Sequence, residues 1–84
     1  MERYFFHLHD GKSLTDEEGT ELESLDAAKK AAIQLIAQTL RDDVDTFWQD
    51  QTYGVTVTDR AGLILFTVEI AATISPAVGK RFRA

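Results

Sequence analysis

The 84-residue sequence has no cysteine, and its single proline lies at position 76. Without a thiol the chain can form no disulfide, no thiolate metal site and no cysteine nucleophile, so redox switching and thiol catalysis are excluded. The absence of cysteine also fits a reducing compartment. The amino terminus, MERYFFHLHDG, has no basic segment followed by a long apolar run. We therefore expect no secretory signal and a cytoplasmic location.

Long hydrophobic runs are missing too. The longest stretch of consecutive apolar residues is the four-residue run from Leu63 to Phe66, whereas a membrane-spanning helix needs roughly 20 such residues. A chain of 84 residues forms one domain with a small core, which leaves little room for a deep substrate cleft. We expect one folded domain without a membrane segment.

Positive charge is scarce outside the last five residues. The chain has nine Lys and Arg against fourteen Asp and Glu, for a net charge of −5. Residues 10–26 contain seven acids and one base, Lys12. Lys80, Arg81 and Arg83 supply three positive charges at the other end, so the rest of the chain carries −8 once these are subtracted from −5. A domain surface with this excess of negative charge binds phosphate groups poorly.

Residues 3–9, RYFFHLH, are rich in aromatic side chains and predict a first strand. The Asp-Gly dipeptide that follows favours a tight turn. Alternation along a strand puts Tyr4, Phe6 and Leu8 on one face and Phe5, His7 and His9 on the other. A second short strand is expected between Leu14 and Leu22, interrupted by the acidic turn DEEG, in which Gly19 can take a positive φ angle.

Apolar residues then recur at intervals of three and four from Leu25 to Val44, which predicts one amphipathic helix from about residue 25 to about residue 43. Ser24 is a good N-cap, and Asp26 suits the positive end of the helix dipole. The early alanines of the apolar stripe predict that this helix approaches a sheet closely.

Residues 45–54, DTFWQDQTYG, are expected to form a polar connection containing Phe47, Trp48 and Tyr53. The segments VTVTD and LILFTVEI then predict a second hairpin, with Gly62 at the position where its loop needs a glycine. Alternation puts Ile64, Phe66, Val68 and Ile70 on one face of the last strand and Leu63, Leu65, Thr67 and Glu69 on the other.

The expected order is strand, strand, helix, strand, strand. An α+β domain of this ββαββ type, assigned to residues 1–75, is most compact as a four-stranded sheet with one long helix packed on one face. The other face, with Phe5 and His7 beside Leu63 and Leu65, then stays open. Because a monomer rarely exposes a large apolar patch, we expect this face to be covered by a second chain or by the protein's own loop or tail.

Four motifs stand in a specific order and spacing: RYFFH before Asp-Gly, DEEG before Leu22, the alanine-rich helix start, and V-T-D-x-x-G from Val57 to Gly62. In these motifs the chain resembles an uncharacterised family of small bacterial proteins classed as a domain of unknown function. The likeness covers most of residues 3–70. It implies a fold but no activity and no catalytic residues. The aromatic connection around Trp48 and the KRFR tail depart from the family pattern.

His7 and His9 are the best candidates for metal ligands, because a His-x-His pair on a strand points both imidazoles to one side, next to Asp10. No further histidine or cysteine exists to complete a tetrahedral site. The DEEG turn does not fit a calcium loop, since counting back from Gly19 puts Leu14 at the first ligand position. We expect neither a metal site nor a cofactor.

No catalytic motif is visible. Ser13, Ser24 and Ser75 occur in turn, cap and pre-proline settings, and no G-x-S-x-G elbow or glycine-rich phosphate loop is present. Carboxylates are plentiful, but a small core does not desolvate them enough for acid–base catalysis. We therefore expect a protein that is not an enzyme.

Residues 76–84 are expected to form a flexible basic tail that combines Lys80, Arg81 and Arg83 with the aromatic Phe82. This composition suits weak, salt-dependent contact with nucleic acid, a solubilising end, or a segment that pairs with the acidic turn. Regulatory nucleic-acid binding through the tail is the second function considered. Weak metal binding at the histidines is the third.

The first function considered is that of a small non-enzymatic interaction module, which forms a homodimer or binds a protein partner through the open sheet face. We expect Phe5, His7, Leu63 and Leu65 to form that surface and Trp48 to lie at its margin, because such residue types are enriched at interfaces. Aromatic residues near a helix end also seal cores, which is the other role open to Trp48.

Overall fold

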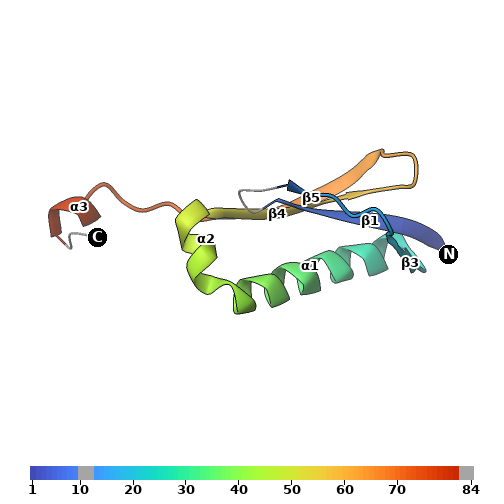
Figure 1. The fold of residues 1–84 in the computed structure, drawn as a ribbon, viewed down its shortest axis with the longest axis horizontal. Helices are drawn as coiled ribbons and strands as arrows, with labels where there is room; N and C mark the ends of the chain where they lie inside the picture. Colours follow the sequence, from blue (N-terminus) through green and yellow to red (C-terminus); the bar gives the residue numbers. More distant parts are fainter. Residues whose placement is uncertain (10–12, 82–84) are drawn as a thin grey trace.

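The computed structural model describes residues 1–9 and 13–81 and has an α+β architecture (Figure 1). In this part of the chain five antiparallel strands form one sheet: β1 (Glu2–His9), β2 (Ser13–Leu14), β3 (Thr20–Leu22), β4 (Thr52–Thr58) and β5 (Ile64–Ala71). The helices are α1 (Leu25–Asp42), α2 (Val44–Asp50) and α3 (Val78–Arg81). The strand order is β2-β1-β4-β5, with β3 also paired to β1.

The expected second strand is split into β2 and β3, which corrects the four-stranded ββαββ prediction. Both pair with β1 on the side away from β4, β2 at Leu8 and β3 at Tyr4. Continuing the β2 register would bring residue 18 opposite Tyr4, but Thr20 takes that place. Two extra residues therefore bulge out of this edge of the sheet, in the acidic turn.

Helix α1 matches the prediction closely. The Ser24 side chain caps it by accepting a hydrogen bond from the Ala27 N–H at 3.1 Å. Ala28 and Ala32 are completely buried, and Ile36 continues their stripe one turn later. These side chains pack against Tyr4, Tyr53, Val55 and Val57 of the sheet to form the core. The close approach that the early alanines predicted is therefore confirmed.

The polar connection expected at residues 45–54 was wrong in two respects. A second helix, α2, starts after Asp43, which is the C-cap of α1, and its own C-cap is Gln51, whose φ of 62° is left-handed. Strand β4 then starts at Thr52, which brings Tyr53 into the core at 3% exposure. Phe47 of α2 packs against this core. This contact stabilises α2, whose seven residues are too few to show a clear helical repeat of apolar side chains in the sequence.

A bulge in β5 reverses part of the predicted alternation. Val57 pairs with Phe66 and Thr58 with Ile64, which leaves Leu65 as an extra residue. Ile64 therefore shares the face of Thr58 and is 63% exposed, whereas Leu65 is half-buried and packs against the core. The faces predicted for these two residues were wrong, because an inserted residue shifts the strand period by one.

Helices α1 and α2 lie on the same side of the sheet, and no described element covers the other side (Figure 1). The chain leaves the sheet after β5, and α3 falls within the predicted tail; residues 82–84 of that tail lie outside the described residues. Among the helices described, none has the length and apolar character needed to cross a membrane.

The alanine stripe of α1 gives a direct test of the helix–sheet contact. Substituting Ala32→Leu should lower the free energy of unfolding by about 1 to 3 kcal/mol, because the larger side chain overpacks a fully buried position. Ala37→Leu, at an exposed position on the same helix, is the matched control. Urea unfolding of both variants measures the difference; equal stabilities would contradict the close packing of α1.

Candidate interaction surface

The uncovered side of the sheet is organised in three rows across β1, β4 and β5, because paired residues of antiparallel strands point to the same side. The rows are Phe5, Thr58 and Ile64; His7, Thr56 and Thr67; and His9, Gly54 and Glu69. The first row is apolar at both ends, and the other two are mainly polar. These residues constitute the open face.

His7 connects the open face to the edge loop, residues 15–19. Its Nε2 lies 3.0 Å from Thr58 Oγ1, and its Nδ1 accepts a hydrogen bond from the Asp16 N–H at 3.1 Å. Because a backbone N–H can only donate, Nδ1 is the acceptor in the contact with Asp16, and Nε2 is left to donate to Thr58. The two partners thus fix the orientation of the His7 ring.

The His9 ring packs against a glycine of the neighbouring strand. Its Nε2 is 3.2 Å from Thr56 Oγ1, which is in turn 3.2 Å from Thr67 Oγ1. A Cβ atom on Gly54, the cross-strand partner of His9, would collide with the His9 ring and approach the Val68 carbonyl oxygen to 3.0 Å. Only glycine therefore leaves room for the ring at this position.

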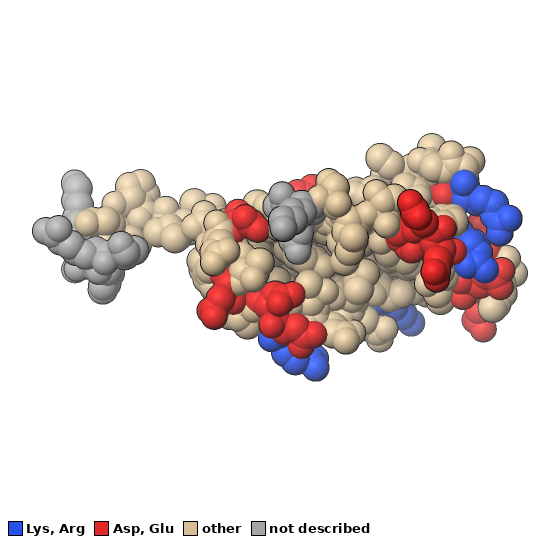
Figure 2. Space-filling view, viewed as in Figure 1, with Lys and Arg blue, Asp and Glu red and all other residues tan. Residues whose placement is uncertain are grey.

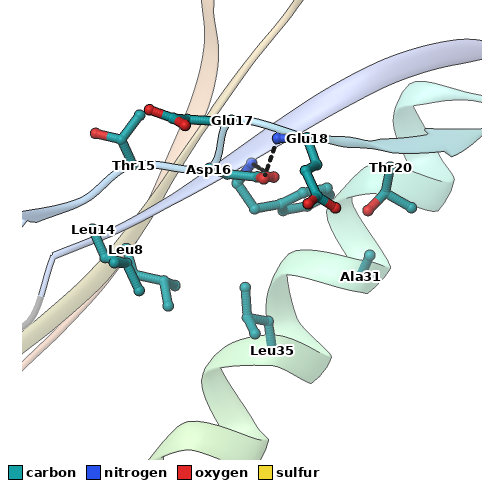
Figure 3. Close-up of a pocket in the computed structure, with 10 residues that line it drawn as sticks. Leu8, Leu14, Thr15, Asp16, Glu17, Glu18, Thr20, Ala31 and Leu35 are labelled. Carbon is teal, nitrogen blue, oxygen red and sulfur yellow. Dashed lines mark hydrogen bonds between the residues drawn. The ribbon is translucent and has the colours of Figure 1, made fainter.

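The Asp16 carboxylate closes the break between β2 and β3. It accepts a hydrogen bond from the Phe6 N–H of β1 at 3.1 Å. It also accepts the Glu18 N–H at 3.1 Å (Figure 3) and the Gly19 N–H at 3.0 Å, both within the edge loop. Since no carbonyl of the interrupted edge strand reaches Phe6 at this point, the carboxylate replaces the missing strand partner.

These contacts lower the pKa of Asp16. Partial burial acts in the opposite direction and raises the pKa, but the hydrogen bonds from the backbones of Gly19, Phe6 and Glu18, with the nearby His7, together outweigh it. Asp16 therefore holds its negative charge more firmly in the folded state than an ordinary aspartate does.

The other end of the edge loop is held by Arg3 and Phe5. The Arg3 guanidinium donates to the Glu18 carbonyl at 2.8 Å and pairs with Glu21 at 3.3 Å. Gly19 has a φ of 73°, as the sequence predicted, and a Cβ there would lie 2.9 Å from the Phe5 ring. The ring of Phe5 thus rests on the glycine, at the apolar end of the open face.

The histidines of this surface take part in hydrogen bonds that hold the sheet and the edge loop together. Both nitrogens of the His7 ring and Nε2 of His9 are engaged in hydrogen bonds. In the described parts of the chain, no group of three or more His, Asp or Glu side chains is placed to hold a metal ion. The network stiffens the face and engages both nitrogens of His7, so a partner can cover the middle of the face without burying an unpaired His7 nitrogen.

The structure separates the residues predicted for the interaction surface. Phe5 and His7 lie together on the open face, and Leu63, 64% exposed, lies in the turn beside Ile64. Leu65 turns to the core. Trp48 is 53% exposed on α2, on the helical side, with its ring edge-to-face on Phe47.

Of the predicted tail contacts, Lys80 and Arg81 belong to α3, and Phe82 and Arg83 lie outside the described residues.

Sequence reasoning missed Ile64 and Asp16. Alternation puts Ile64 on the same face as Phe66 and Val68, because the bulge that turns it outward leaves no mark on the alternation of apolar residues. In the sequence, Asp16 is only one of the three acids of the turn DEEG. A signal was present in its position, since an aspartate two and three residues before two turn N–H groups often caps them.

A comparison with protein families matches residues 3–71 to the family described as Domain of unknown function (DUF6894). No curated protein and no solved structure matches the chain.

Replacing the Asp16 carboxylate tests its role at the sheet edge. Asp16→Asn should lower the free energy of unfolding by about 1 to 3 kcal/mol, because an amide cannot accept all three N–H groups as a carboxylate does. Glu17→Gln is the matched control at an exposed neighbour. Similar losses in the two variants, measured by urea unfolding, would contradict the bridging role.

The stability difference between wild type and Asp16→Asn should also depend on pH, and the lowered pKa of Asp16 fixes the direction of that dependence. The pKa of Asp16 is lowered on folding, so its contribution is complete above the unfolded-state pKa of about 3.9 and is lost as the pH falls through the lower folded-state pKa. The stability difference between wild type and Asp16→Asn should therefore shrink as the pH falls from about 5 to about 2. A difference that stays constant over this range would be inconsistent with the lowered pKa.

The contact of His9 with Gly54 is measurable as a coupling energy. Gly54→Ala should destabilise the domain by about 1 to 3 kcal/mol, since the new Cβ meets the ring. In a His9→Ala background the same change should cost at least ~1 kcal/mol less. The four proteins of this double-mutant cycle are compared by urea unfolding, and additive effects would show that the ring does not require the glycine.

Proposed function

Because the chain belongs to the family Domain of unknown function (DUF6894), we propose its function from its surfaces: it is a non-enzymatic interaction module that binds a second protein chain through the apolar end of the open face. The second chain is another copy or a different protein. The surface consists of Phe5, Ile64 and Leu63, with Thr58 between the two strands that carry them.

The observation that carries this proposal is the outward placement of two neighbouring large apolar residues. Leu63 and Ile64 are 64% and 63% exposed, at the end of a hairpin that no described element covers. Burying two such side chains against a partner contributes about 1.5 to 3 kcal/mol each. The cost of ordering them is small, since β5 holds Ile64 in register with Thr58.

The neighbouring rows support the same function. Their histidine and threonine side chains hydrogen-bond to one another, so this part of the face is polar and rigid. An apolar contact bordered by satisfied polar groups is the usual composition of a protein–protein interface. The engaged nitrogens of His7 are, for the same reason, poorly suited to act as a catalytic base.

The test compares wild type with the double variant Leu63→Glu/Ile64→Glu and with the control Ile33→Glu, which changes an apolar residue of 55% exposure on α1. Self-association is measured by sedimentation velocity, and partner binding by quantitative capture from a lysate of the source cells. The double variant should lose association that Ile33→Glu retains, with unchanged circular dichroism. If it kept the mass and all partners of the wild type, the proposed surface would be wrong.

A further inference from the structure

A groove runs between the edge loop and α1, on the opposite side of β1 from the open face (Figure 3). Its volume is about 630 Å³. Phe6 and Leu8 of β1 and Leu35 of α1 supply an apolar floor, and Leu14 stands at its mouth with 64% exposure. The groove therefore offers a concave apolar surface to a side chain from outside.

The groove follows from the broken sheet edge. The edge loop stands away from α1, because its extra residues bulge where a continuous strand would pack side chains against the helix. On the helix side the wall includes Ala31, which is too small to fill the space. The rim is acidic, since Glu17 and Glu18 are exposed along the loop.

The complementary chemistry is an aromatic or aliphatic side chain flanked by positive charges. The C-terminal sequence of this same chain has that composition: the segment from Val78 to Arg83 reads VGKRFR. It carries three of the nine Lys and Arg of the chain. The rest of the molecule is acidic, and acidic side chains are prominent over the body in Figure 2. Charge alone thus draws this segment towards the body of a copy.

The described part of this segment, Val78–Arg81, lies away from the groove of its own chain. The chain after β5 leads away from the sheet, and α3 lies beyond α2 (Figure 1). The radius of gyration is 15.5 Å, against about 12 Å for a compact chain of this length. Phe82 and Arg83 reach at most about 7 Å beyond Arg81, whereas the molecule is 53 Å long.

We propose that the C-terminal segment of one copy docks in the groove of a second copy, with Phe82 on the leucine floor and the neighbouring cations beside Glu17 and Glu18. Two copies that exchange their segments reciprocally satisfy both grooves and form a closed dimer. This contact lies on the other side of β1 from the open face, so it does not depend on the proposed function above.

Charge reversal in the 84-residue chain tests the electrostatic part of the proposal. The variants are Glu17→Lys/Glu18→Lys in the groove, Lys80→Glu/Arg81→Glu in the segment, and the two sets combined. Each set alone should weaken dimerisation roughly tenfold or more at low salt, and the combination should recover most of the loss. The association constants come from sedimentation velocity over ~10 µM to ~1 mM protein, a range suited to weak dimers.

A matched control makes the same charge change elsewhere on the acidic body. Asp42→Lys/Asp50→Lys places two lysines at the exposed carboxyl ends of α1 and α2, where the helix dipoles tolerate them. This variant should dimerise as wild type does. If it weakened the dimer as much as the groove reversal, general charge attraction rather than docking in the groove would be responsible.

The apolar half is tested with Phe82→Ala and Leu14→Glu, each of which should weaken the dimer roughly tenfold without unfolding the domain, because Leu14 is mostly exposed. In mixtures of labelled and unlabelled wild type, the methyl resonances of Leu8 and Leu35 should receive intermolecular cross-saturation. A wild type that is monomeric up to ~1 mM at low salt would overturn the proposal.

Two further outcomes separate the alternatives. A dimer that persists in all groove and segment variants but is lost in Leu63→Glu/Ile64→Glu would support the open face and overturn the exchange of segments. Binding of an RNA or DNA oligonucleotide that Lys80→Glu/Arg81→Glu removes, with an oligomeric state unchanged by the groove reversal, would assign the segment to nucleic acid instead.

Discussion

The hydrogen bond from the Phe6 N–H to the Asp16 carboxylate is the contact on which the two surfaces of this domain depend. It lies where the edge strand is interrupted, between the β2 pairing at Leu8 and the β3 pairing at Tyr4. A second bond, from the Asp16 N–H to the His7 ring, fastens the loop to the open face of the same strand. One residue thus anchors the edge loop to both the edge and the open face of β1.

Both surfaces follow from that anchor. On the open side, Gly19 of the anchored loop supports the Phe5 ring, and His7 is held in one orientation against Thr58. On the helical side the same loop, kept away from α1, forms the wall of the acidic-rimmed groove. The domain is therefore a thin sheet with one helical layer whose exposed edges and faces are shaped by a loop rather than by a larger core.

Much of this fold could be predicted from local sequence. The aromatic alternation correctly placed Tyr4, Phe6 and Leu8 towards the helix. The cap at Ser24 and the positive φ angle at Gly19 follow from the chemistry of single residues, and both are present. Signals of this kind are reliable because each depends on a few neighbouring atoms.

The remaining features depend on contacts between distant segments. Helix α2 is held by burial of Phe47, and the bulge at Leu65 exchanges the faces expected for Ile64 and Leu65. Neither feature changes the local apolar pattern, so periodicity cannot detect it. The candidate surface was accordingly predicted in outline, with Phe5 and His7 in place, while Ile64 and the anchoring role of Asp16 emerge only when the strands are paired.

Residue-specific amide hydrogen exchange of Phe6 tests the anchor most directly. The Phe6 N–H points to the edge where strand pairing is interrupted, so the carboxylate alone accounts for its protection. At neutral pH the Phe6 amide should exchange within about tenfold of the rates of Tyr4 and Leu8, whose pairing on this edge is with β3 and β2. Exchange of Phe6 at the rate of an unstructured amide, with Tyr4 and Leu8 protected, would contradict the account.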